Sequence, residues 1–558
     1  MKFKKRMNNE KQSSPAHLFA GRLIIMWSAL LFCLLYWGNL GCGGRPSIYN
    51  EQLNISGPIV VGPHLAYLDK TRERIVLLRP FTGEVRHVKV GRRPVFMMPA
   101  PSQRELLVVC KGWVAEEQGE DDEEPSLVLI ETESGESISY SLESPFDEVA
   151  VSSDNKYALA YFSASAGPGD NEVFRNPNAT AILNLETGEI VHKTVRSFGD
   201  VPRGVLFSPP NMAPMKADGT LGEPRSLAVV FAEGYLTFLD ITNPERREVT
   251  VRLTLPEMGS QDMIGQQMVF VPSAGNAFLR VSFSSDIYTF SFMERETNEP
   301  WENDFVLSVN TLAAGSVPGD IAVFDQDDEQ KLLVANYSSK DIVVIDAYTS
   351  QFKSIPVGTS VDRIILHPES NPTTAIVYSK GYPQAKVHFL ELWDLEEKMG
   401  RNLDTLHTSQ PILSIEKIHG QNRFLVIHDD SRSVMSVLNP EEQTLSPLTA
   451  HSSLSGYTVN SSGTILAGYT GGSNQLGLVN MADLSVRTLV LAHEPRRLLA
   501  LRRAPDADPD QEMNTIVVDH GEKLGLLTVI SNPVTADRAS TFVMSGFMLK
   551  DILDDRLE

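Results

Sequence analysis

The sequence lacks the linear motifs that mark many enzymes. It contains no nucleophile elbow, no glycine-rich phosphate loop, no paired-cysteine redox motif and no HExxH zinc motif. This absence weakens the case for catalysis without excluding it, because loops from separate repeats can build a site that leaves no motif. The sequence therefore assigns no catalytic residue, no metal ligand and no cofactor.

Cysteine is scarce, with 3 residues in a chain of 558. Cys33 lies in an apolar N-terminal stretch, Cys42 follows that stretch, and Cys110 stands in a strand-like apolar run. A single thiol in the folded body cannot form an intrachain disulfide. We expect Cys110 to be a small buried side chain rather than a nucleophile.

Basic residues are outnumbered, with 49 Lys and Arg against 71 Asp and Glu, and the net charge is −22. Such a field repels nucleic acid, so we expect no nucleic-acid partner. The acidic runs Glu116–Glu124 and Asp325–Glu329 lack the alternating spacing of a calcium-binding loop. We interpret them as solvated surface.

The N-terminus lacks a run long enough for an ordinary membrane helix. The uncharged stretch Leu23–Trp37 falls short of the roughly twenty apolar residues that such a helix needs. Basic residues precede this stretch and small residues follow it, which is the layout of a secretory signal. The junction Asn39-Leu40-Gly41-Cys42-Gly43 resembles the lipobox of bacterial lipoproteins, with Asn39 where leucine is usual. The resemblance implies a lipid on Cys42, while secretion without a lipid and an uncleaved signal anchor remain open.

These features divide the chain into three parts. Residues 1–41 are expected to be a lipoprotein-type signal peptide, and 42–57 a linker after the lipidated cysteine. Residues 58–558 are expected to form the folded body, outside the cytoplasm and held at a membrane of the bacterial cell envelope. Whether this would be the inner or the outer membrane is left open.

The body contains a repeat of about fifty residues in about ten copies. Its clearest copy, Lys331–Asp346, contains two apolar β runs joined by a polar turn. A further run precedes this hairpin and another follows it, with turn residues between them, so each repeat holds four strands. A four-stranded antiparallel meander repeated in this way predicts an all-β fold, the β-propeller.

The repeats can close into one ring or divide into two. We expect one large ring of about ten blades, although two rings are possible because the repeats shorten after the long segment Glu294–Ser316. We also expect the ends to meet, with Phe542–Leu553 closing the ring on the first blade, since propellers often pair a terminal strand there.

One repeat resembles the YVTN family of surface propeller repeats. The resemblance rests on Val334–Asn336, Ile342–Asp346 and Pro356–Gly358, with similar turns at Thr82–Glu84 and Thr187–Glu189. It implies a propeller and brings no catalytic residues with it.

Two His–Asp pairs occupy the same place in their repeats. His428-Asp429 and Asp519-His520 begin the turn between the second and third strands. Equivalent positions of different blades lie on one face of a ring, so these groups could form a metal site or an acid/base cluster. The alternative is that Asp and His stabilise their own turns.

The favoured function is a membrane-anchored, extracytoplasmic propeller that acts as a protein-binding scaffold in the cell envelope. The alternative from another class is a secreted hydrolase, similar to a lactonase, with a metal or acid/base cluster near the ring axis. A third possibility is a structural repeat protein without a discrete ligand.

Overall fold

The computed structural model describes residues 52–113, 122–164, 176–253, 265–281, 284–297, 299–326, 329–370, 373–383, 385–393, 395, 403–448, 453–502, 514–531 and 541–550. The chain divides into an N-terminal unit, Met1–Leu53, and a large unit, Asn54–Glu558. No helix in these described ranges is long and apolar enough to cross a membrane.

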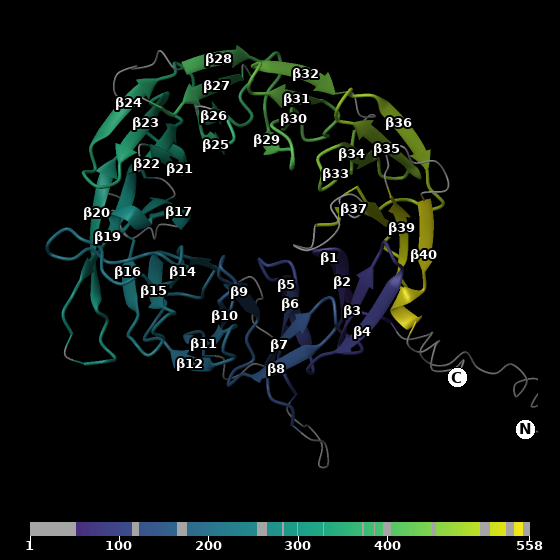
Figure 1. Cartoon of the computed structure of the whole chain (residues 1–558), viewed down its shortest axis with the longest axis horizontal. Helices are drawn as coiled ribbons and strands as arrows, with labels where there is room; N and C mark the ends of the chain where they lie inside the picture. Colours follow the sequence, from purple (N-terminus) through teal and green to yellow (C-terminus); the bar gives the residue numbers. More distant parts are fainter. Residues whose placement is uncertain are drawn as a thin grey trace, which may run out of the picture. The chain divides into compact units, whose positions relative to one another are not determined.

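The large unit consists of ten four-stranded antiparallel sheets that stand in one ring (Figure 1). Each sheet is built from four consecutive strands, with the first strand nearest the ring axis and the fourth on the outside. The expected all-β propeller with ten blades in a single ring is therefore confirmed, and the two-ring arrangement is not adopted.

The first five blades occupy the N-terminal half of the large unit. Their strands are, in blade 1, β1 (Ile55–Val61), β2 (His64–Asp69), β3 (Arg74–Arg79) and β4 (Glu84–Lys89); in blade 2, β5 (Pro94–Pro99), β6 (Glu105–Cys110), β7 (Ser126–Glu131) and β8 (Ser137–Ser141); in blade 3, β9 (Glu148–Val151), β10 (Tyr157–Tyr161), β11 (Ala179–Asn184) and β12 (Ile190–Thr194); in blade 4, β13 (Gly204–Phe207), β14 (Leu227–Ala232), β15 (Tyr235–Asp240) and β16 (Val249–Arg252); and in blade 5, β17 (Gly265–Val271), β18 (Asn276–Val281), β19 (Asp286–Glu294) and β20 (Phe305–Ala313).

The remaining five blades complete the ring. Their strands are, in blade 6, β21 (Pro318–Gln326), β22 (Glu329–Asn336), β23 (Asp341–Asp346) and β24 (Phe352–Pro356); in blade 7, β25 (Arg363–His367), β26 (Thr374–Tyr378), β27 (Lys386–Glu391) and β28 (Leu403–His407); in blade 8, β29 (Ser414–Lys417), β30 (Phe424–Ile427), β31 (Met435–Asn439) and β32 (Thr444–Leu448); in blade 9, β33 (Gly456–Val459), β34 (Ile465–Tyr469), β35 (Gln475–Asn480) and β36 (Val486–Val490); and in blade 10, β37 (Arg497–Ala500), β38 (Ile516–Asp519), β39 (Leu526–Ile530) and β40 (Thr541–Ser545). Short 3₁₀ helices are η3 (Pro272–Ala274) and η5 (Phe547–Leu549).

The turn after the third strand follows one local rule in several blades. In blade 6, Asp346 accepts hydrogen bonds through Oδ1 from the backbone N–H groups of Tyr348 at 3.0 Å and Thr349 at 2.7 Å. An asparagine side chain at the end of the third strand makes the same kind of turn in blades 3, 8 and 9, at Asn184, Asn439 and Asn480. Asp and Asn are favoured at such positions because their side chains hold the turn's own backbone.

The hydrophobic core consists of layers between neighbouring blades. The layer between blades 1 and 2 joins Leu68 and Ile75 to Leu106, Val108 and Cys110, all of them fully or almost fully buried. Burial raises the pKa of the Cys110 thiol to about 12, so this side chain stays a neutral thiol and behaves as a small apolar group. The same interblade layering recurs around the ring.

The two ends of the large unit meet, as expected, but they do not exchange a strand. β40 pairs with β39 inside blade 10, and blade 1 is completed by its own four strands. Closure is instead made by side chains and loops: Arg74 donates to the backbone oxygen of Met548 at 2.6 Å, and Arg497 donates to that of Gly57 at 2.6 Å. The strand exchange proposed from the sequence is therefore wrong, because blade 10 already holds four strands.

The ring has two faces that differ in their connections. We call the face that carries the turns between first and second strands and between third and fourth strands the lower face. The upper face carries the turns between second and third strands and the crossings from one blade to the next. Because consecutive strands are antiparallel, this division holds in every blade.

Candidate protein-binding surface

The structure places His428 on the upper face of blade 8, directly after β30. Its Nδ1 lies 2.8 Å from the backbone oxygen of Pro411 and its Nε2 lies 2.9 Å from Ser436 Oγ. A carbonyl can only accept, so Nδ1 carries the proton and Nε2 accepts from the serine hydroxyl. Both ring nitrogens are thus used by local partners, and the buried ring ties the loop before β29 to β31.

His520 makes the same arrangement in blade 10, two blades away. Its Nδ1 lies 3.0 Å from the backbone oxygen of Glu494 and its Nε2 lies 2.8 Å from Thr528 Oγ1. Asn336 fills this place in blade 6, where its Nδ2 donates to the backbone oxygen of Ala314 at 2.8 Å. We call this contact, from the end of a second strand to the loop before its own blade, the loop latch.

The carboxylates of the two pairs also have local partners. Asp429 accepts from the backbone N–H of Ser433 at 2.9 Å and caps its turn. Partial burial acts to raise the pKa of Asp429, but hydrogen bonds from Ser431, Ser433 and Val434 lower it to about 2. Asp519 accepts from the N–H of Gly521 at 2.9 Å, and burial raises its pKa.

The predicted cluster therefore remains two separate local arrangements. Every hydrogen bond described above for His428, Asp429, Asp519 and His520 is made within the residue's own blade or the loop that precedes it. In the described part of the chain, no group of three or more His, Cys, Asp or Glu side chains is placed to hold a metal ion. Cys42, the expected lipidation site, lies outside the described residues.

The lower face is lined with carboxylates. In blades 1 to 9 the connection between third and fourth strands, or the strand residue that borders it, is acidic, at Glu84, Glu133, Glu186, Glu245, Glu299, Asp346, Glu391, Glu441 and Asp483. Some of them cap turns, as Asp346 and Asp483 do. Three others, Glu84, Glu133 and Glu186, form ion pairs with basic side chains. The rest add negative charge to this face, which attracts partners with basic residues.

Exposed aromatic side chains gather on the lower face of three consecutive blades. The connections of blades 5, 6 and 7 present Trp301, Tyr348 and Trp393, which are 47%, 50% and 44% exposed, and Phe352 at the start of β24 is 57% exposed. Large aromatic side chains are enriched at protein-binding surfaces, where they act as anchors. We call these four residues the aromatic row.

An insertion braces this surface at blades 4 and 5. Residues 209–226, between β13 and β14, lie against the lower end of blade 5, where Met215 forms a parallel bridge with Met293. The N–H of Met215 donates to Phe292 O at 2.7 Å, and the N–H of Glu294 donates to Met215 O at 2.8 Å. The insertion thus adds backbone bonds to the part of blade 5 that carries Trp301.

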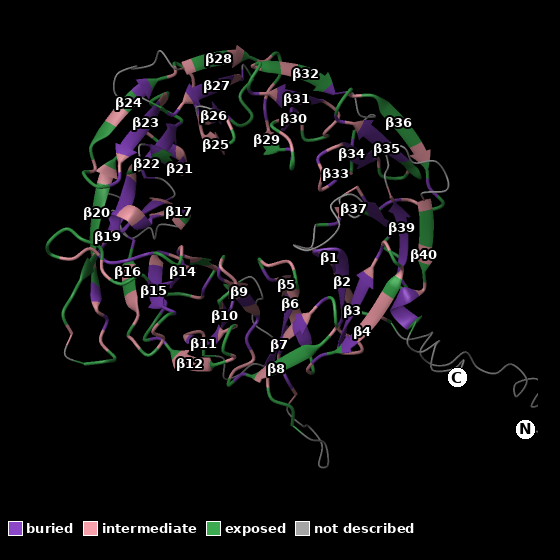
Figure 2. Cartoon of the chain, in the orientation of Figure 1, coloured by how far each residue is buried: buried purple, intermediate pink, exposed green. Residues whose placement is uncertain are grey.

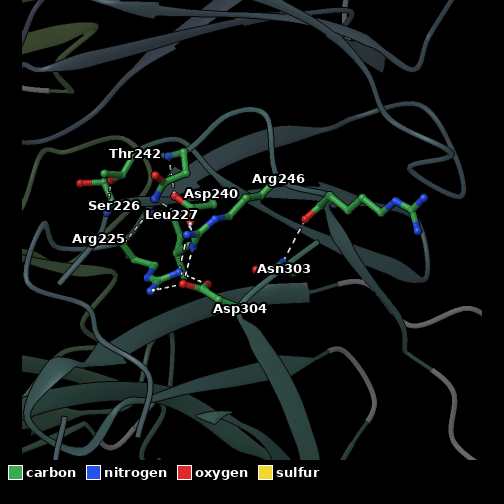
Figure 3. Close-up of polar contacts among 11 residues, drawn as sticks. Arg225, Ser226, Leu227, Asp240, Thr242, Arg246, Asn303 and Asp304 are labelled. Atoms are coloured by element: carbon green, nitrogen blue, oxygen red, sulfur yellow. Dashed lines mark hydrogen bonds and ion pairs between the residues drawn. The ribbon is translucent and has the colours of Figure 1, made fainter. Parts of the chain in front are cut away.

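A buried ionic network fixes the insertion (Figure 3). Arg225 binds both carboxylate oxygens of Asp304, with Nη2 at 3.0 Å from Oδ2, and its Nη1 lies 3.2 Å from Asp240 Oδ2. Arg246 contacts the same two carboxylates, at 3.7 Å from Asp240 and more closely at Asp304. Two arginines and two aspartates therefore join the insertion, the end of β15 and the start of β20.

The ionisation of this network follows from its burial. Burial alone would lower the pKa of Arg225, but the hydrogen bonds and charges of Asp304 and Asp240 raise it above its ordinary value. Burial likewise acts to raise the pKa of Asp304, and the two arginines lower it. For Asp240, which is almost fully buried, desolvation prevails and its pKa is raised. Arg225 and Asp304 thus form a bidentate ion pair within the network.

Two hollows accompany these features. One of about 430 Å³ lies between blades 3 and 4 and is lined by Tyr157, Asn184, Glu189 and Arg246 among others. Another of about 550 Å³ lies between blades 1 and 2, where Lys89, Asp122, Glu123 and the serines of β8 line it. Neither hollow is lined by the histidines singled out from the sequence.

Comparisons with known proteins give only distant structural likenesses. No protein-family model and no curated protein match the sequence. Among solved structures, dihydro-heme d1 dehydrogenase NirN in complex with DHE aligns at 10% identity and a TM-score of 0.37, covering 77% of this chain and 73% of that one. A eukaryotic initiation factor aligns at 11% identity and a TM-score of 0.43 over 84% and 93%, and a chain of the mitotic checkpoint complex at 12% and 0.32 over 62% and 86%. Likenesses this weak transfer no ligand, partner or activity to the present chain.

Proposed function

We propose that this chain is a bacterial lipoprotein whose ten-bladed ring binds other proteins, as a scaffold held at the cell envelope by a lipid on Cys42. The observation that carries the proposal is the aromatic row on the acidic lower face of blades 5 to 7. The N-terminal signal pattern supplies the location, and the repeat of blade 6 supports assignment to the YVTN type of propeller.

The binding part of the proposal follows from the free-energy cost of exposing the large aromatic side chains of the aromatic row to water. Aromatic residues bury large apolar areas when a partner covers them, and they dominate the energetics of many interfaces. The surrounding carboxylates favour partners with basic residues and speed their approach. A rigid ring with this surface on one face fits a scaffold better than an enzyme pocket.

The binding test uses the full-length tagged chain in native bacterial envelopes, solubilised with detergent. Trp301→Ser combined with Trp393→Ser is expected to lose the proteins that the unchanged chain captures. Tyr382→Ser is the matched control, because Tyr382 is 39% exposed but lies on the upper face. Equal capture by both variants, or no partner beyond the bare matrix, would overturn the proposal.

The anchoring test is separate. Intact mass of the chain extracted from membranes is expected to show an acylated chain that begins at Cys42. Cys42→Ala should move the protein to the soluble envelope fraction. An unmodified chain in that fraction without any substitution would show that the protein is secreted without a lipid.

A further inference from the structure

The outer edge of β20 differs from the outer edges of the other blades. The fourth strand of each blade has one edge without a neighbouring strand, and Figure 2 shows these outer strands as mostly exposed or intermediate. Exposed edges pair readily with other strands, and proteins usually protect them with charges, prolines or short length. Most outer strands here are protected in this way, through the residues Glu84, Arg86, Lys89, Lys193, Arg252, Lys353, Pro356, Asp404, Pro447 and Arg487.

β20 lacks all three protections. Its nine residues, FVLSVNTLA, contain no charge and no proline, whereas the other outer strands have four to six residues. β8 and β40 are also uncharged, but each has only 5 residues. Along β20, Val306 is 42% exposed and Val309 is 37% exposed. A long, uncharged edge rich in β-branched residues is the kind of strand that accepts another strand.

The hydrogen-bond pattern identifies the backbone groups that face outward. The N–H groups of Phe292 and Glu294 donate to Gly275 and Met215, on the inner side of β19, whereas the N–H of Arg295 donates to Asp304 at 2.7 Å. Odd-numbered residues of β19 therefore face β20, and their register partners in β20 are even-numbered. It follows that the N–H and C=O groups of Leu307, Val309 and Thr311 point away from the sheet.

The charges beside this edge indicate the chemistry of its occupant. At its lower end, β20 joins a connection with four exposed or half-buried glutamates, Glu294, Glu296, Glu299 and Glu302, of which Glu302 is paired with Arg295 at 3.6 Å. At the upper end, Ala313 is followed by the uncharged residues 314–319. An occupant is therefore favoured if it carries basic residues at the end that reaches the glutamates. A second copy of this chain offers the same uncharged strand and a net charge of −22, which opposes self-association.

We propose that β20 binds an extended segment of a partner protein, added as a fifth strand antiparallel to β20, with Lys or Arg at its C-terminal end. This inference rests on the proposed scaffold function and names the chemistry of one partner segment. Antiparallel addition places the C-terminal end of the segment beside the glutamates at the start of β20. Main-chain hydrogen bonds to residues 307, 309 and 311 supply affinity, and the basic end supplies direction.

The test is a peptide-binding assay with the full-length protein. The probe is fluorescein-labelled Ser-Val-Thr-Val-Thr-Val-Lys-Lys, compared by fluorescence anisotropy with a peptide that ends in Glu-Glu instead. Val309→Pro removes one outward N–H without touching the bonds to β19, and Val309→Thr is its matched control. We expect Val309→Pro to weaken binding of the basic peptide by about tenfold or more and Val309→Thr to change it by less than about threefold.

Two further variants test the β20 site if Val309→Pro does not fold. Val309→Lys places a charge on the edge without altering the backbone and should weaken binding of the basic peptide by about fivefold or more. Glu296→Lys with Glu299→Lys should reverse the preference between the basic and acidic peptides. If Val309→Lys and the double glutamate variant both bind the two peptides as the unchanged chain does, the proposal is overturned.

The remaining outcomes separate this inference from the scaffold proposal. Substitution of the aromatic row can abolish capture of envelope partners while Val309→Pro and Val309→Lys leave peptide binding unchanged. That result would support the scaffold proposal and would show that β20 is not the binding site. If the unchanged chain sediments as a dimer and Val309→Lys sediments as a monomer, the occupant is a second copy and the proposed partner segment is wrong.

Discussion

Blades 4 and 5 differ from blades 6 to 8 in how polar side chains join neighbouring segments. Blades 4 and 5 rely on a charged network, in which Arg225 and Arg246 bind Asp240 and Asp304. In blades 6 to 8 the loop latches of Asn336 and His428 are neutral contacts, although Glu369 of blade 7 also pairs with Lys417 of blade 8. One fold is thus stabilised by two kinds of contact, and in blades 4 and 5 the charged kind joins an insertion to the repeat.

The outer strands of these blades also differ in whether their free edges are protected against pairing with another strand. Blade 6, the clearest repeat in the sequence, ends in a short outer strand with Lys353 and Pro356. Blade 5 ends in the long uncharged strand β20, beside an insertion and an ionic network. Departures from a repeat are expected where a fold carries function, since the repeat itself needs only to fold. The following predictions test this comparison, beginning with the largest effect.

The largest effect is expected from Arg225→Ala. The substitution leaves Asp240 buried with a weaker partner at 3.7 Å and removes the bidentate contact to Asp304, so we expect a loss of about 3–5 kcal/mol in the free energy of unfolding. Urea unfolding measures the loss, and hydrogen exchange at Met215 and Glu294 should rise with it. Arg295→Ala, an exposed arginine of the same region, should cost less than about 0.5 kcal/mol. Equal effects of the two variants would show that the network does not brace the insertion.

The next effect tests a neutral contact of blade 7 through pH. His388 is 1% exposed, between Thr359 Oγ1 at 2.8 Å and Thr405 Oγ1 at 3.0 Å, and burial lowers its pKa to about 4. The unfolded chain takes up this proton below about pH 6.5 while the folded chain does not. Stability from neutral His388 is therefore complete above pH 6.5 and is lost as pH falls toward 4.

The measurement compares urea unfolding of the unchanged chain and His388→Gln at pH 7 and pH 5. We expect the unchanged chain to lose about 2 kcal/mol between these pH values that the variant does not lose. An identical pH dependence would mean that His388 is protonated in the folded ring. Within the charged network, Asp304 should contribute little change in this window, because its carboxylate has a lowered pKa.

Much of the fold could be predicted from the sequence, and the reason is visible in particular residues. Apolar runs and turn formers mark each hairpin locally, as at Asp346 and its turn, so the ten repeats could be counted before their arrangement was known. The strand β20 was missed because FVLSVNTLA lies in a long segment and does not alternate strictly between apolar and polar residues. The shorter repeats after that segment left two rings possible beside the preferred single ring, whereas the segment holds the longest of the described outer strands.

The contacts of the two histidines and of the ionic network were harder to predict, because the residues that they join are distant in sequence. The equivalence of His428 and His520 was visible, but their carbonyl partners, Pro411 and Glu494, lie 17 and 26 residues earlier. A usable signal was present nonetheless, since each histidine is followed 8 residues later by its hydroxyl partner, Ser436 or Thr528. The network of Arg225 and Asp304 spans 79 residues and left no local pattern.

A smaller effect tests the loop latch itself. His428→Ala leaves the carbonyl of Pro411 and the hydroxyl of Ser436 without their partner, and we expect a loss of about 1–3 kcal/mol in the free energy of unfolding. His428→Asn should recover part of this loss, because Asn336 makes the equivalent contact in blade 6. Urea unfolding of both variants gives the answer. If asparagine restores nothing, the latches of blades 6 and 8 are not interchangeable.

The smallest effect tests whether β24 binds the peptide as β20 does once the protecting charge and proline of β24 are removed. In a Val309→Pro background, Lys353→Val with Pro356→Thr removes the charge and the proline from β24 and should change the free energy of unfolding by less than about 1 kcal/mol. We expect binding of the Lys-Lys peptide to stay about tenfold or more below that of unaltered β20, because 5 residues offer fewer outward backbone groups than 9. Recovery of full binding in the anisotropy assay would show that length is irrelevant and that charge and proline alone distinguish the two edges. Weak binding would instead show that removing the charge and the proline is not enough, and that the length of β20 and the glutamates beside it are part of the site, since an added strand gains affinity with each main-chain pair it forms.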